Sequence, residues 1–175
     1  KIVNDHVSDN PNSFELIHMK GKGCNSFSGG QIISENKVFS AVSGAGASNV
    51  FLLDGVDVDL HSEHGCLGSN SVNAVSSKEH FGPFVVRDCD VRDPGHRGIW
   101  MHVSKRVYAL GNRCSAGGFS IDFDAYCFHS AAIFNTVTRN SYHSGIFFEE
   151  CVKSNTAFAN LCEKNSANGI CMWTE

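Results

Sequence analysis

Apolar and polar residues alternate over short stretches of this chain, with a spacing that suits strands. In the stretches 99–103, 119–124 and 146–149, apolar residues recur at every second position. A period of two predicts strands that bury one face and expose the other. The chain holds 17 Gly, 13 Phe and only 3 Pro, which favours many short strands with tight turns over long helices.

A repeat of about two dozen residues runs through the second half of the chain. The segments 88–99, 135–146 and 160–170 share an early Asp or Asn, a second Asp or Asn and a closing Gly-Ile, and 111–121 is a looser copy. This alignment equates Asp88, Asn112, Asn135 and Asn160, then Asp93, Asn140 and Asn165, then Gly98, Gly118, Gly145 and Gly169. We expect the glycines to adopt corner conformations that other residues resist, and the asparagines to bond backbone groups of neighbouring coils.

A period of this length, with Gly and Asn at fixed places, predicts a β-solenoid. Leucine-rich repeats need several Leu at fixed spacing, and helical repeats need apolar positions every 3.6 residues, so neither fits. The predicted fold is all-β: a right-handed, single-stranded parallel β-helix of about six to seven coils, either complete or a fragment of a longer solenoid. We expect residues 1–30 to form an N-terminal cap or arm, and 31–175 to form the β-helix with a loop insertion near 61–80.

These repeats resemble the parallel β-helix repeats of pectate-lyase-like proteins over about residues 45–175. The stretch 96–102, HRGIWMH, followed by Asn112 and by Gly118-Phe119, is also similar to a stretch in the β-helix region of fibrocystin-like and hyaluronan-processing ectodomain proteins. Those proteins have Gly-His where this chain has Gly118-Phe119, and 122–124 only approximates their Leu-Glu-Asp. The resemblance implies an extracellular or cell-surface protein that binds or processes carbohydrate.

Strand alternation predicts which side chains of the repeats face inward and which outward. Ile99, Ile121, Ile146 and Ile170 should share one interior row. One outward column should contain His102, Asp124, Glu149 and Trp173, and the adjacent column Trp100, Asp122, Phe147 and Cys171. Neighbouring coils stack about 4.8 Å apart, so residues distant in sequence would form continuous stripes on one solvent-facing sheet.

Candidate chemistry is concentrated in these two columns. Asp122, Asp124, Glu149 and His102 are the candidate catalytic residues, because carboxylates about 5–9.5 Å apart serve as acid and base in glycoside hydrolases. The rings of Trp100, Phe147 and Trp173 are candidates for stacking on sugar faces. The same carboxylates suit Ca²⁺, although no metal-ligand motif is present. Alternatively, the column is charged only because this face of the strands is exposed to solvent.

A second candidate set is basic. Arg97, Lys105 and Arg106 lie close together in sequence and could neutralise the carboxylate of a uronate substrate, as the resemblance to β-helix lyases and epimerases implies. Among the cysteines, Cys114 and Cys162 should share a buried apolar column with Val137, and Cys127 and Cys151 are candidates for a bridge between successive coils.

Composition narrows the function classes. The net charge of −4 supplies no basic field for nucleic acid, and no stretch of about 18 apolar residues predicts a membrane span. The chain opens at Lys1 without Met, which suggests a processed chain or an excised fragment. We therefore expect an extracellular β-helix module that binds a glycan or serves as a scaffold. The alternatives are a polysaccharide-active enzyme and a filament subunit that contacts neighbouring chains through its solenoid ends.

Overall fold

The structure is a computed structural model of the chain. It describes the backbone of residues 2–4, 15–20, 24–34, 40–46, 50–59, 73–80, 83–92, 97–102, 105–125, 127–141, 143–150 and 153–173. Side chains are described for residues 26, 28–31, 52–57, 83–92, 97–101 and, from 105 onward, the same residues as the backbone.

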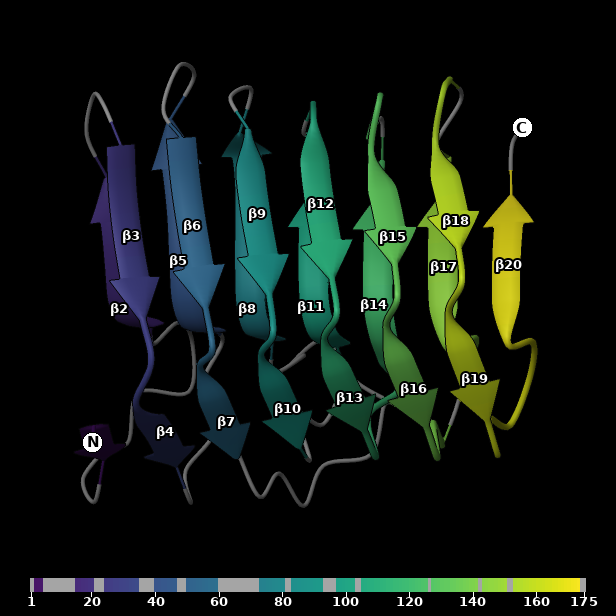
Figure 1. Cartoon of the computed structure of the whole chain (residues 1–175), viewed down its shortest axis with the longest axis horizontal. Coiled ribbons are helices and arrows are strands. Elements are labelled where there is room, and N and C mark those ends of the chain that lie inside the picture. The colour runs from purple at the N-terminus through teal and green to yellow at the C-terminus, as the bar shows by residue number, and fades with distance from the viewer. Residues whose placement is uncertain are drawn as a thin grey trace.

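Within the described residues, the strands form three parallel sheets of seven, seven and six strands (Figure 1). The first sheet contains β1 Ile2–Asn4, β4 Gln31–Ser34, β7 Asp57–Asp59, β10 Asp90–Arg92, β13 Arg113–Ser115, β16 Thr136–Thr138 and β19 Leu161–Glu163. The second contains β2 Glu15–Lys20, β5 Ser40–Gly46, β8 Asn73–His80, β11 Arg97–His102, β14 Phe119–Asp124, β17 Ile146–Glu149 and β20 Ile170–Trp173. The third contains β3 Cys24–Ser28, β6 Val50–Asp54, β9 Phe84–Arg87, β12 Val107–Leu110, β15 Ala131–Ile133 and β18 Thr156–Phe158.

Each full coil contributes one strand to each sheet, and the strands of a sheet follow one another in chain order. In Figure 1 the chain runs down the front through the third and first sheets, returns upward through the second sheet behind, and advances from left to right. That combination of turning and advance is right-handed, so the predicted right-handed parallel β-helix is confirmed.

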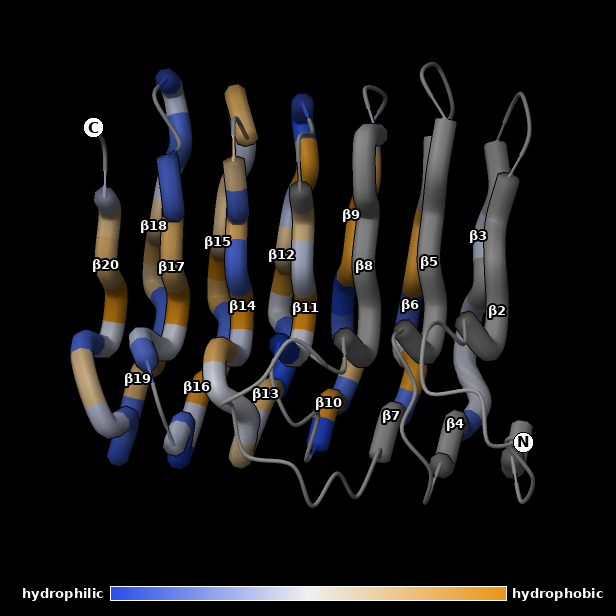
Figure 2. The backbone as a smooth tube through the Cα atoms, turned by 180° about the vertical axis from the view of Figure 1, so that it is seen from behind, coloured by the Kyte–Doolittle hydropathy of each residue, from blue (hydrophilic) through white to orange (hydrophobic). Residues whose placement is uncertain are grey.

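The predicted interior row is also confirmed. Ile99 pairs with Ile121, Ile121 with Ile146, and Ile146 with Ile170. The first three are fully buried. Phe123 and Phe148 stack beside this row, with ring centroids 4.5 Å apart. Figure 2 shows the resulting hydrophobic bands at the same height in β11, β14, β17 and β20. Burial of these stacked rows is the main force that holds successive coils together.

Asparagine ladders join the coils at the corner between the third and first sheets. Asn135 Oδ1 accepts hydrogen bonds from the backbone N and from Nδ2 of Asn112, each at 3.0 Å. Asn160 Oδ1 accepts the same two bonds from Asn135, each at 2.9 Å. The ladder follows the predicted asparagine pairing, except at its first member. The strand register places Cys89, rather than Asp88, level with Asn112, because Asp90 pairs with Arg113.

Our expectation about the repeat glycines is wrong in two respects. Gly118 does not share the position of Gly98, because Arg97 pairs with Phe119 and so places Ser120 level with Gly98. Nor does Gly98, Gly145 or Gly169 have the left-handed backbone expected of a corner glycine. Left-handed corners are instead occupied mostly by other residues, such as Phe134 and Ala159.

Close approach between coils explains two of the repeat glycines, Gly98 and Gly145. A Cβ on Gly145 would lie 2.8 Å from the Gly169 carbonyl oxygen and 2.9 Å from a methyl group of Val137. We therefore predict that Gly145→Ala lowers the free energy of unfolding by about 1–3 kcal/mol, because the backbone of the next coil must shift. Chemical denaturation would measure the loss. Gly55→Ala is the comparison, because a Cβ there meets nothing within 4 Å and only its left-handed φ of 62° opposes the change.

The N-terminal segment and the expected insertion both contribute strands. β1, β2 and β3 lie within residues 1–30, the expected cap or arm, and pair in parallel with β4, β5 and β6. Residues 73–80 belong to the expected loop near 61–80 but form β8, which pairs with β5 and β11. The remainder of that expected loop, 61–72, lies outside the described residues.

Two cysteine predictions have different outcomes. Cys114 pairs with Val137 and Val137 with Cys162, so the predicted column exists. The predicted bridge from Cys127 is wrong, because Cys127 carries a buried reduced thiol that donates a hydrogen bond to the Met101 carbonyl at 3.2 Å. Its expected partner, Cys151, lies outside the described residues.

Candidate functional site

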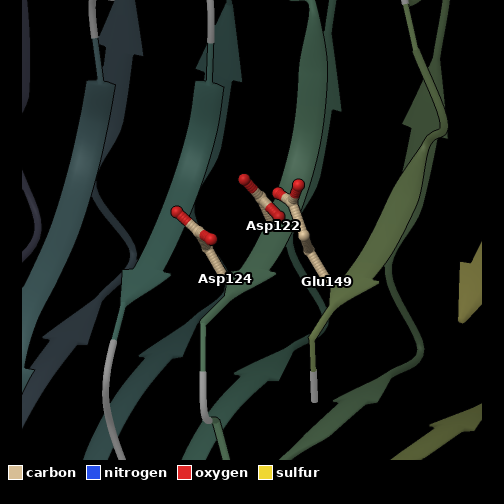
Figure 3. A group of neighbouring side chains, drawn as sticks. All are labelled: Asp122, Asp124 and Glu149. Atoms are coloured by element: carbon tan, nitrogen blue, oxygen red, sulfur yellow. The ribbon is translucent and has the colours of Figure 1, made fainter. Parts of the chain in front are cut away.

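The outer face of β11, β14 and β17 carries the candidate residues in the predicted columns. Trp100 pairs with Asp122, and Asp122 with Phe147. In the adjacent column His102 pairs with Asp124, and Glu149 pairs with Trp173 of β20. The side chain of His102 lies outside the described part of the structure, so its predicted catalytic role stays a prediction. The other three catalytic candidates are the carboxylates of Asp122, Asp124 and Glu149, which converge (Figure 3).

This face is far less exposed than we expected. Asp122 is 0% exposed, Trp100 9% and Phe147 3%, although alternation correctly assigns all three to the outer side. Their neighbours on adjacent coils cover them. The prediction of a wholly solvent-facing column is therefore wrong for these residues, and the rings of Trp100 and Phe147 offer little free surface to a sugar. Asp124 and Glu149 are half-buried and remain accessible.

Arg97 organises the acidic residues. Its Nε donates to Oδ2 of Asp122, and its Nη2 lies 3.7 Å from Oδ2 of Asp124. The guanidinium also lies 5.0 Å from the ring centroid of Trp100 and 5.3 Å from that of Phe119. A planar cation held between two rings and two carboxylates has little freedom, so Arg97 fixes the spacing of the acids.

Asp124 and Glu149 complete the cluster. Asp124 Oδ2 accepts a hydrogen bond of 2.9 Å from Nε1 of Trp100, which satisfies the indole of that buried ring. Oxygens of Asp122, Asp124 and Glu149 all lie within 4.8 Å of one another. Asp122 and Asp124 come from β14 and Glu149 from β17, so the cluster exists only because two coils stack in register (Figure 3).

Burial and like charge alter the ionisation of two of these acids. Burial is the main cause that raises the pKa of Asp122 to about 7; the charges of Asp124 and Glu149 add to it, and the Arg97 cation opposes it. The pKa of Glu149 is also raised, first by burial and then by Asp124. Within the described part of the chain, nothing hydrogen-bonds Oδ1 of Asp122. Asp122 therefore carries a proton for part of the time at neutral pH.

A row of rings lies beside the acids and follows the solenoid axis. Phe119 and Phe147 stack with centroids 5.7 Å apart, and Phe147 and Trp173 with centroids 6.5 Å apart. The imidazole of His143 stacks on Phe119 at 4.6 Å and contacts Phe147 at 4.8 Å. Burial lowers the pKa of His143, which favours the neutral ring. Trp173, 48% exposed, is the accessible end of this row.

Sequence reasoning missed Phe119 and His143 as members of the site. If every second residue faces inward, Phe119 should share the interior with Ile121, two positions later. By the same rule Arg97 should share the interior with Ile99. Alternation fails at the strand start, where Ser120 turns its Oγ toward Oδ1 of Asn140 at 2.5 Å. Gly98 holds the level position on the preceding coil. Gly98, Ser120 and Gly145 are level with one another near the strand starts. This column of small residues is the signal that could have identified where alternation fails.

The two other basic candidates do not join the cluster. Lys105 and Arg106 are exposed and lie beyond the end of β11, where Lys105 bridges to Phe128 just before β12. Of the predicted basic set, the structure brings only Arg97 to the acids.

The three acids could contribute oxygens to a Ca²⁺ ion, as the sequence suggested. Ca²⁺ takes about six to eight oxygen ligands, whereas this set offers one carboxylate from each of three residues. Arg97 already neutralises two of the three. The geometry therefore fits an ion-pair network better than a calcium site.

Comparison of the chain with protein-family models, curated proteins and solved structures found no match. Within the described residues, no helix is long and apolar enough to cross a membrane.

Proposed function

We propose that the outer face of β11, β14, β17 and β20 binds a carbohydrate chain, and that the protein is an extracellular β-helix module for this purpose. As part of this proposal, we also suggest that the repeats are related to those of pectate-lyase-like and fibrocystin-like proteins, which they resemble in sequence. The observation that carries it is the exposed ring of Trp173, which ends the ring row and lies level with Glu149, beside the half-buried carboxylates of Asp124 and Glu149. A linear glycan laid along the solenoid axis would meet an apolar ring and hydrogen-bond acceptors together.

The charge of the site indicates the kind of glycan. Among the described side chains, Arg97 is the one cation in the cluster, and it is already paired with Asp122 and Asp124. Glu149 adds a further carboxylate, and Lys105 and Arg106 lie beyond the end of the strand. The accessible surface is therefore acidic, which disfavours a uronate polymer and favours a neutral or amino-sugar chain.

Binding to glycans of different charge tests this proposal. We expect the protein to bind a glucosamine polymer or a neutral glucan, and to bind a polyuronate at least about tenfold more weakly. Trp173→Ala should weaken binding about tenfold, because it removes the accessible ring. Phe158→Ala removes a ring on the third sheet that is exposed at least as much (60% against 48%) and is the matched control. Equal affinity of the Trp173 and Phe158 variants, or preference for the polyuronate, would contradict the proposal.

A second candidate function is glycoside hydrolysis, and a specific observation favours it. The accessible acids Asp124 and Glu149 have oxygens within 4.8 Å, near the separation of about 5–5.5 Å used by retaining enzymes. The raised pKa of Glu149 suits a general acid, and Asp124 would be the nucleophile. Asp122 is fully buried and would act on its neighbours rather than on substrate.

Product analysis separates the enzyme from the binding module. If the protein is a hydrolase, Glu149→Gln should lower kcat at least about 1000-fold on a cleaved glycan while leaving KM within a few-fold. The pH–rate profile should lose its alkaline limb in the same variant, since that limb reports the general acid. Binding without any product across the same glycans would leave the binding module as the function.

A further inference from the structure

The acidic cluster carries more negative charge than Arg97 neutralises. Among the described side chains, the three carboxyls of the cluster face a single guanidinium. Arg97 is placed on one side of them: it donates to Oδ2 of Asp122 and lies 3.7 Å from Oδ2 of Asp124. Like charges gathered in a partly buried site repel one another, so a second cation among these acids would be bound favourably.

One buried oxygen of the cluster has no hydrogen-bond donor. Asp122 is 0% exposed, and within the described residues no donor reaches its Oδ1. Arg97 of β11 holds the other oxygen, Oδ2. Figure 3 shows the carboxyl of Glu149, from the opposite neighbour β17, next to that of Asp122. Oδ1 therefore points into the group of three acids, where a ligand carrying N–H donors would satisfy it.

The two accessible acids also have oxygens to offer. Within the described part of the chain, the donors that contact Asp124 reach its Oδ2, and none contacts Glu149. Both side chains are half-buried, so a ligand approaching from solvent meets them first. Because the side chain of Glu149 is long and rotatable, its carboxylate can turn aside and admit a small donor to Oδ1 of Asp122.

The spacing of these acceptors fits a primary ammonium group. A tetrahedral nitrogen that donates three charge-assisted hydrogen bonds of about 2.8 Å holds its three acceptors about 4.6 Å apart. One oxygen from each of the three acids lies within 4.8 Å of the others. A primary ammonium has three donors to satisfy, whereas Ca²⁺ takes about six to eight oxygens. The set of acceptors is therefore complete for an ammonium and incomplete for Ca²⁺.

We propose that this cluster binds the ammonium group of an amino sugar whose ring stacks on Trp173. The proposal rests on the carbohydrate-binding function proposed above and makes its ligand more specific: a chain of glucosamine with free amino groups, rather than a neutral glucan. Trp173 is 48% exposed and level with Glu149 on the adjacent strand. A sugar ring on the indole would therefore present an amino substituent to Glu149 and, next to it, to Asp122.

Matched ligands test the ammonium contact. We expect a glucosamine tetramer with protonated amino groups to bind at least about tenfold more tightly than the same tetramer after N-acetylation, which removes the charge and all but one N–H of each nitrogen. Methylammonium should shift the side-chain carboxyl NMR signals of the three acids. Tetramethylammonium, which has the same charge but no N–H, should leave them unchanged at the same concentration.

Variants of similar shape assign the contact to these residues. Glu149→Gln and Asp122→Asn should each reduce the preference for the free amine to less than about threefold, since each replaces a carboxylate by a neutral amide. Glu163→Gln, which alters an exposed carboxylate of β19 on the first sheet, is the control and should keep the full preference. Trp173→Ala should weaken binding of the tetramer about tenfold and leave the methylammonium shifts unchanged, because methylammonium has no ring to stack.

The outcomes separate this proposal from the function on which it rests. Equal affinity for the free and acetylated tetramers would overturn the ammonium contact and leave the carbohydrate-binding function standing. Preference for the free amine retained in both Glu149→Gln and Asp122→Asn would overturn the assignment to these acids. Methylammonium shifts without binding of either tetramer would exclude an amino sugar as the ligand and remove the carbohydrate-binding function with it.

Discussion

Asp122→Asn is expected to stabilise the protein at pH 8 and to leave its stability nearly unchanged at pH 4. The folded-state pKa of Asp122 is raised from the ordinary value of 3.8 to about 7, mainly by burial. Between these values the unfolded chain has released the proton and the folded chain still holds it. The wild-type free energy of unfolding must therefore fall as the pH rises from about 4 to about 7. Asn resembles the protonated acid in shape and never ionises.

The expected size of this effect is about 4 kcal/mol at pH 8, since a tenfold change in an ionisation constant corresponds to about 1.4 kcal/mol. Denaturation of both proteins from pH 4 to 8 would measure it. Glu149, whose pKa is also raised, should leave a smaller slope of the same sign in the variant. Asp88→Asn is the matched control at an exposed aspartate and should retain the full wild-type slope. If the free energy of unfolding changed with pH in the same way in wild type and Asp122→Asn, the buried position of this carboxyl would be contradicted.

Asn135→Ala is expected to lower the free energy of unfolding by about 3–5 kcal/mol, a loss of roughly 10 °C in Tm. Asn135 is almost fully buried and joins three coils. Its Oδ1 accepts from Asn112, and its Nδ2 donates to the Ala109 carbonyl and to Asn160 Oδ1, both at 2.9 Å. Alanine would leave several of these buried groups without partners, and each costs about 1–3 kcal/mol.

The control for this variant is Asn168→Ala, an asparagine of the last coil whose side chain is exposed. It should change stability by less than about 0.5 kcal/mol. Asn135→Asp offers a graded comparison, because it keeps the acceptor for Asn112 but loses the donor to the Ala109 carbonyl. A loss in Asn135→Ala no larger than in Asn168→Ala would show that the ladder does not hold the coils together.

Strand alternation and repeat spacing predicted the fold and the outline of the site. The isoleucine row and both outward columns follow from a period of two along the strand and about two dozen residues per coil. They depend on covalent spacing alone, so a correct alignment of Ile99, Ile121 and Ile146 was enough. The same reasoning aligned Gly118 with Gly98 because both precede a strand, whereas the hydrogen-bonding register placed Ser120 there.

The sequence by itself determined that this chain coils, which side chains share a row, and that three acids and several rings meet on one face. Only the tertiary structure decided that Asp122, Trp100 and Phe147 are covered and that Arg97 turns outward to pair with two acids. It also showed that Gly98 and Gly145 serve close approach between coils. The physical reason is that alternation states the side from which a residue leaves its strand. What then covers that residue, and so sets its charge and accessibility, depends on neighbours about 25 residues away in sequence and on the strand ends where alternation stops.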